Sequence, residues 1–155
     1  MEKLILFSAA LVALAACSSG DHMENRVFEA VQDSDLIRQA TSIPCGQDLK
    51  INALSFQERC WTLDVTELEI ETIKEESLAL GLAMQTAFDL PSEAIETGQP
   101  ETILQRGKTQ DGCAHYIRAR FSPDQPSGTE PNIMKIAIGV TEKPHCGELN
   151  LNEAI

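Results

Sequence analysis

The sequence predicts one small α+β domain, in which a long helix and shorter helices pack on a mostly antiparallel sheet and two disulfides stabilise the fold. Three observations predict this class. Apolar residues recur at three- and four-residue steps between residues 70 and 88, as on one face of a helix. Apolar residues alternate with other side chains at residues 116–121 and 133–140, as in strands with one buried face. Four cysteines downstream of residue 20 form an even set.

A helix over residues 26–40 is the first predicted element, and it ends before the Ile43-Pro44 pair. Its imperfect apolar stripe consists of Val27, Phe28, Val31, Leu36, Ile37 and Ala40. Two strands are predicted next, because apolar and polar residues alternate around Ile51 and again around Leu63. The apolar members of these strands are Leu49, Ile51 and Ala53 in the first, and Trp61, Leu63 and Val65 in the second.

A long helix over residues 67–89 is predicted to follow. Apolar residues occupy odd positions up to Val65, whereas glutamates occupy positions 67, 69 and 71, so a continuing strand would turn its buried face outward. Thr66 and Glu69 match a capping box. The predicted buried stripe is Ile70, Ile73, Ser77, Leu80, Met84 and Phe88. Leu90 before Pro91 ends this helix, and a short helix over 91–97 is expected to close at Gly98.

The C-terminal third is predicted to form antiparallel sheet. Residues 103–107 are a short candidate strand. In the next strand Ile117, Ala119 and Phe121 face one way, while Tyr116, Arg118 and Arg120 face the other. Residues 122–132 contain proline and glycine and read as a loop. The last strand has a buried face made of Met134, Ile136, Ile138 and Val140, so a hairpin with a long loop is expected.

The first twenty residues have the pattern of an export signal. The run from Leu4 to Ala16 is apolar except for Ser8, and it is shorter than the roughly 20 apolar residues that a membrane-spanning helix needs. Such a run is typical of the core of a secretory signal. Ala15 and Ala16 precede Cys17, and this arrangement resembles the lipobox of bacterial lipoprotein signals. Glu2 departs from the usual pattern, since it partly cancels the charge of Lys3.

The resemblance implies cleavage before Cys17 and acylation of its sulfur and amine, which would anchor the chain to a membrane. Ser18 follows the cysteine where an aspartate would be a retention signal, so the resemblance implies an outer-membrane lipoprotein that faces the periplasm. We therefore expect a signal peptide over residues 1–16, a lipidated tether over 17–25 and a single domain over 26–155.

The chain is strongly acidic, with a formal net charge of −12 that is unchanged when residues 1–16 are removed. Such a charge repels nucleic acid and anionic lipid and favours a cationic partner. Only 5% of the residues are aromatic, which argues against a platform for stacking bases. An acidic run between Asp64 and Glu76 could bind calcium or a basic protein, but it lacks the turns and glycine of a calcium loop, and we interpret it as a solvated helix N-terminus.

Cys45, Cys60, Cys113 and Cys146 allow three disulfide connectivities. In an oxidising envelope we expect Cys45 to pair with Cys60, and Cys113 with Cys146. An alternative is a zinc or copper site made by Cys113, His115, His145 and Cys146 at the ends of the predicted hairpin. The absence of a CxxC motif and the expected export both favour the disulfide.

A basic cluster stands out in this acidic chain, and it could bind a carboxylate or phosphate on one face of the sheet. It consists of Arg106, Lys108, Tyr116, Arg118 and Arg120. A solvated sheet face is the alternative interpretation. The sequence contains no HExxH, Walker loop, dinucleotide glycine pattern or GxSxG elbow, so we predict no catalytic residue, cofactor or metal.

These observations together predict a non-enzymatic envelope lipoprotein that binds a basic protein partner, for example as an inhibitor of a cationic hydrolase such as lysozyme. A small periplasmic hydrolase that uses His115 or carboxylates is one alternative. A carrier of zinc or copper through Cys113, His115, His145 and Cys146 is the other.

Overall fold

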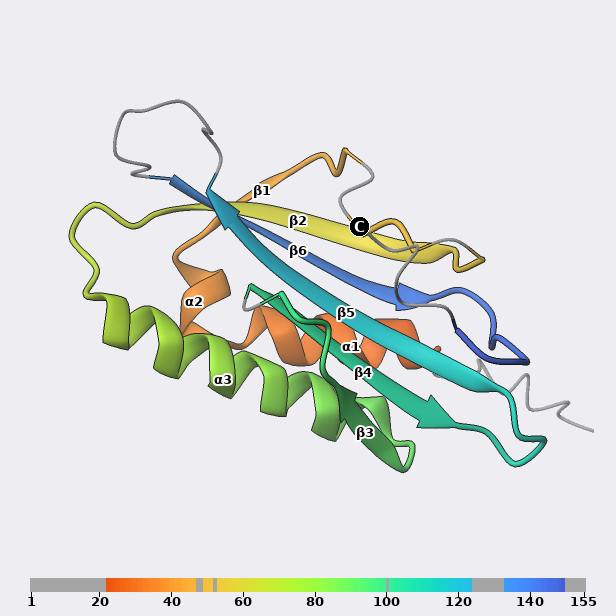
Figure 1. The fold of residues 1–155 in the computed structure, drawn as a ribbon. Helices are drawn as coiled ribbons and strands as arrows, with labels where there is room; N and C mark the ends of the chain where they lie inside the picture. Colours follow the sequence, from red (N-terminus) through yellow and green to blue (C-terminus); the bar gives the residue numbers. More distant parts are fainter. Residues whose placement is uncertain (1–21, 47–48, 52, 100, 124–132, 150–155) are drawn as a thin grey trace, which may run out of the picture.

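The residues that the structure describes form a six-stranded antiparallel sheet with three helices on one of its faces, which confirms the predicted α+β class (Figure 1). The structure is a computed structural model, and it describes residues 22–46, 49–51, 53–99, 101–123 and 133–149. Both predicted disulfides are present, Cys45 with Cys60 and Cys113 with Cys146. None of the helices in the described ranges has the length and apolar content to span a bilayer.

The sheet has the strand order β1-β2-β6-β5-β4-β3. Its strands are β1 (Thr41–Ile43), β2 (Phe56–Asp64), β3 (Ser92–Ile95), β4 (Thr102–Lys108), β5 (Ala114–Pro123) and β6 (Ile133–Thr141). The last strand lies between β2 and β5, and it pairs with β2 from Phe56 opposite Thr141 to Asp64 opposite Ile133. The centre of the sheet therefore joins the middle of the chain to its C-terminal part.

The main core lies between the sheet and the helices α1 (Met23–Gln32), α2 (Asp35–Arg38) and α3 (Ile70–Phe88). These helices bury apolar residues against the side chains at alternate positions of β2, β5 and β6. Fully buried members of this core include Phe28, Val31, Leu80, Met84, Phe88, Ile117, Ile136 and Ile138. The predicted inward faces of the last two strands are thus confirmed.

The opposite face of the sheet is also covered, in part by the chain between β1 and β2. Leu49 packs in a cluster with Cys60 and Ala137, and Ile51 packs in a cluster with Leu104 and Tyr116. The Cys45–Cys60 disulfide fastens this segment to β2. The predicted strand at residues 49–53 is wrong, because residues 51 and 54 form only an isolated bridge and Ala53 has a positive φ of 72°. The two strands that flank β2 in the sheet are β1 and β6.

The N-terminal helix is divided, because the chain turns at Asp33 and the hydroxyl of Ser34 accepts a hydrogen bond from the backbone N–H of Ile37. This is the N-cap of α2, so one predicted helix is two. The first helix also begins at Met23, inside the stretch that the sequence predicts to be a tether.

The long helix is confirmed, but it begins at Ile70 rather than at residue 67. The capping box is wrong, since the backbone N–H and the hydroxyl of Thr66 both donate to the carboxylate of Asp64 and no side chain caps the N-terminus of α3. Ile70 is 70% exposed and does not belong to the buried stripe. The predicted helix over 91–97 is also wrong, because this segment contains β3, which pairs with β4.

Candidate functional site

Cys17, the predicted lipidation site, lies outside the described residues. The described residues begin at His22, which directly precedes the first turn of α1. Arg26 in α1 forms an ion pair with Asp89 at the C-terminus of α3, with 2.9 Å between Nη1 and Oδ2. The N-terminal end of α1 and the C-terminal end of α3 therefore lie close together.

The Cys113–Cys146 disulfide occupies both sulfur atoms of the alternative metal set. Thiolate ligation at this place would first require reduction of that bond. A second group of candidate ligands, Cys45, Glu58 and Cys60, contains the other disulfide and is subject to the same requirement. In the oxidised structure neither group offers a thiolate to a metal ion.

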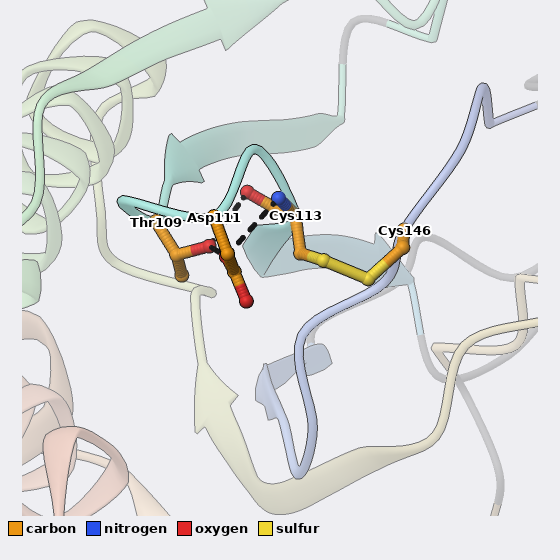
Figure 2. The surroundings of a disulfide bond; sticks show 4 residues. All are labelled: Thr109, Asp111, Cys113 and Cys146. Atoms are coloured by element: carbon orange, nitrogen blue, oxygen red, sulfur yellow. Dashed lines mark hydrogen bonds between the residues drawn. A yellow bond between two sulfur atoms is a disulfide. The ribbon is translucent and has the colours of Figure 1, made fainter.

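Figure 2 shows how the turn between β4 and β5 presents Cys113 to Cys146. The carboxylate of Asp111 accepts hydrogen bonds from the hydroxyl of Thr109 and from the backbone N–H of Cys113. These two bonds, with the Thr109 bond the larger cause, lower the pKa of Asp111 below its ordinary value. Gly112 has a φ of 82° in this turn, a conformation that favours glycine. The polar side chains beside this disulfide therefore form hydrogen bonds that shape the turn between β4 and β5.

His115, the base of the alternative hydrolase, contacts a side chain that substrate cannot reach. Its Nδ1 lies 3.2 Å from the hydroxyl oxygen of Thr141. Thr141 is fully buried, and its hydroxyl also accepts the backbone N–H of Tyr116. His115 does not line the open pockets that lie along β3 and β4. One ring nitrogen of this half-buried histidine is therefore engaged in a contact with the core of the domain.

The predicted basic cluster does not converge on one point. At one end of β4, Arg106 forms an ion pair with Glu93 of β3, which lies directly opposite in the sheet. This contact raises the pKa of Arg106 and lowers that of Glu93, and Lys108 adds a weaker attraction to the same carboxylate. These two cations therefore already have an anionic partner within the protein.

Arg118 belongs to a second, buried part of the cluster. It is only 4% exposed, and its Nη1 donates to the backbone carbonyl of Lys50 at 2.9 Å. Gly139 lies between Arg118 and Glu58 in the sheet register, and the carboxylate of Glu58 attracts the guanidinium. Burial is the main cause that lowers the pKa of Arg118, and the charge of Arg120 on the same strand adds to it. Arg118 is therefore buried at the place where the chain between β1 and β2 covers the sheet.

A pocket of about 530 Å³ has Tyr116 and Arg106 in its wall. The other charged residues that line it are Glu93, Glu96 and Glu148, all of which are exposed. Carboxylates outnumber the single guanidinium, so the pocket favours a cationic group over the carboxylate or phosphate that the sequence suggested.

The outer side of α3 is a feature that the sequence analysis missed. Leu78 and Leu82 are 72% and 64% exposed, although both are large apolar residues in the middle of a helix. The signal was present in the sequence: both leucines lie outside the predicted stripe of Leu80, Met84 and Phe88. Comparisons of the chain with protein-family models, with curated proteins and with solved structures find no match.

Proposed function

We propose that this protein is a lipid-anchored accessory lipoprotein of the bacterial envelope, which binds a basic protein partner and catalyses no reaction. The observation that carries the proposal is the way in which the domain uses its few cations. Arg26, Arg38, Lys74 and Arg106 each form an ion pair with an aspartate or glutamate of the same chain. Arg118 is buried. Each ion pair engages one carboxylate for one cation, so the excess of acidic over basic residues in the chain, a net charge of −12, is left without cations of the same chain to balance it.

An excess of carboxylates attracts cationic partners over distances of roughly 10 Å at moderate salt. The net charge of −12 and the carboxylate-lined pocket beside Tyr116 both support such a partner. Two disulfides suit an oxidising compartment, and the lipobox-like sequence ending at Cys17 suits attachment to the envelope membrane.

Mass spectrometry of the protein purified from its native host tests the anchor. We expect loss of residues 1–16 and acyl chains on Cys17. An intact leader or an unmodified Cys17 would overturn this half of the proposal.

Capture from detergent-solubilised envelopes tests the partner. The full-length protein is used as bait at low salt, and bound proteins are eluted with increasing salt and identified. We expect the salt-eluted fraction to be enriched in proteins of high isoelectric point, relative to capture on an unrelated lipoprotein of equal net charge. Equal enrichment on both baits would contradict a dedicated basic partner.

A further inference from the structure

The solvent-facing side of α3 carries an apolar pair at a place where a surface helix normally has polar residues. Leu78 and Leu82 lie one helical turn apart and point away from the buried Leu80 and Met84 of the same helix. Of the exposed large apolar side chains in the described ranges, only Ile133 lies outside α3. This side of α3 therefore leaves apolar area in water that no neighbouring element of the described structure covers.

Acidic side chains occupy the same side of the helix, nearer its N-terminus. Glu75 precedes Leu78 by three residues and Leu82 by seven, and Glu71 lies one further turn back. Glu71 pairs with Lys74 at 2.8 Å, whereas Glu75 makes no ion pair with any residue that the structure describes. The side thus changes along its length from charged to apolar.

We propose that these four residues, Glu71, Glu75, Leu78 and Leu82, form a docking surface for an amphipathic basic helix of the partner protein. This inference rests on the proposed binding function and names its site. Apolar residues of the partner helix would cover Leu78 and Leu82, and its lysines or arginines would lie against Glu71 and Glu75. The carboxylates select a cationic partner and the leucines supply the burial.

The negative charge of the chain favours a basic helix over two other possible occupants of an apolar helix face, namely a second copy of the chain and a membrane surface. A second copy of the chain would also carry a net charge of −12, so two copies repel each other. A membrane surface with anionic lipids would repel the glutamates beside the leucines. A basic helix is attracted by the same carboxylates.

The test uses the full mature chain in phosphatidylcholine nanodiscs and two fluorescent peptides of leucine and lysine. One peptide has the leucines on one helical face, and the other has the same composition in scrambled order. Anisotropy titrations at low and moderate salt measure both affinities, with empty nanodiscs as the blank. We expect the ordered peptide to bind more tightly, and the double substitution Leu78→Ser with Leu82→Ser to weaken it by about tenfold or more.

Matched variants separate this surface from general attraction. Ile133→Ser removes an exposed apolar side chain outside α3 and should leave the affinity unchanged. Glu75→Gln and Glu29→Gln remove the same charge, from the docking surface and from the exposed side of α1. We expect Glu75→Gln to weaken binding clearly more than Glu29→Gln. Circular dichroism checks that each variant keeps its fold.

Three outcomes would overturn the docking surface: equal binding of the two peptides, equal effects of the two glutamine variants, or no loss of affinity in the leucine double variant. A leucine-dependent dimer in sedimentation, or leucine-dependent binding to anionic vesicles, would assign the surface to another occupant and also overturn it. Envelope capture with the leucine double variant distinguishes a failure of this docking surface from a failure of the proposed function. Retained capture of the basic protein refutes only this surface, whereas no salt-sensitive capture by the unsubstituted chain refutes the proposed function.

Discussion

Nη1 of Arg118 donates a hydrogen bond to the backbone carbonyl of Lys50 at 2.9 Å, across a sequence separation of 68 residues. This bond joins the central strand β5 to the segment that covers the second face of the sheet. Because the guanidinium is buried with Glu58 as its nearby anion, Arg118 acts as part of the fold rather than as an exposed ligand-binding residue.

Arg118→Ala is therefore expected to lower the free energy of unfolding by about 2–4 kcal/mol, since it removes the bond to Lys50 and a cation beside Glu58. Arg38→Ala is the control, because Arg38 is exposed and its ion pairs with Asp33 and Asp35 should contribute about 0.5 kcal/mol or less. Urea unfolding followed by circular dichroism measures both. Equal effects of the two substitutions would show that Arg118 does not help to hold the chain between β1 and β2 against the sheet.

The two disulfides should each contribute to stability by restricting the unfolded chain. Cys45 and Cys60 are 15 residues apart, and Cys113 and Cys146 are 33 apart. Replacing a pair with serines should lower the free energy of unfolding by about 3 kcal/mol for the shorter loop and by about 4 kcal/mol for the longer one. Chemical denaturation measures this loss. Titration of the denatured, unreduced protein should find no free thiol at these four positions, and a free pair would contradict the assignment.

A larger residue at Gly139 is expected to destabilise the fold while Leu49 is present. A Cβ atom at position 139 would lie 2.8 Å from Cδ1 of Leu49 and 3.1 Å from Cβ of Phe56. Gly139→Ala should therefore cost about 1–3 kcal/mol through overpacking. In a Leu49→Ala background the same substitution should cost less, and a double-mutant cycle of unfolding free energies measures the difference. Strict additivity would mean that the two positions do not touch.

Acidification should weaken the turn that carries Cys113. The pKa of Asp111 is lowered in the folded state, so its ionised form stabilises the fold above the unfolded pKa of about 4. This contribution is lost as the pH falls through the lower, folded value. Thr109→Val removes the main cause and should move the pKa of Asp111 up toward its ordinary value in an NMR titration. Thr86→Val, on the exposed side of α3, is the control. An Asp111 pKa at its ordinary value in the unsubstituted protein would refute the turn geometry.

The sequence predicted those elements whose pattern is local and repeats along the segment. Alternation around Ile117 and Ile136 predicted β5 and β6, and the repeat through Leu80 and Met84 predicted α3. The strand β3 escaped prediction, because Pro91 and Gly98 around a short segment also suit a helix, and only pairing with β4 decides between the two. The basic cluster was predicted as a set of residues, but its members separate, since Glu93 and Lys50 come from other parts of the chain.

The sequence by itself determined the α+β class, the disulfide-rich character and the acidity, because these depend on composition and on patterns within single segments. The tertiary structure alone decided that β6 lies between β2 and β5, that residues 49–51 bury Arg118, and that Leu78 and Leu82 remain in water. Each of these depends on which distant segment covers a side chain. The periodic pattern of a segment shows which of its faces is buried but not which distant segment covers it. The sequence therefore placed Leu78 and Leu82 outside the buried stripe, and only the packing showed that no described residue covers them.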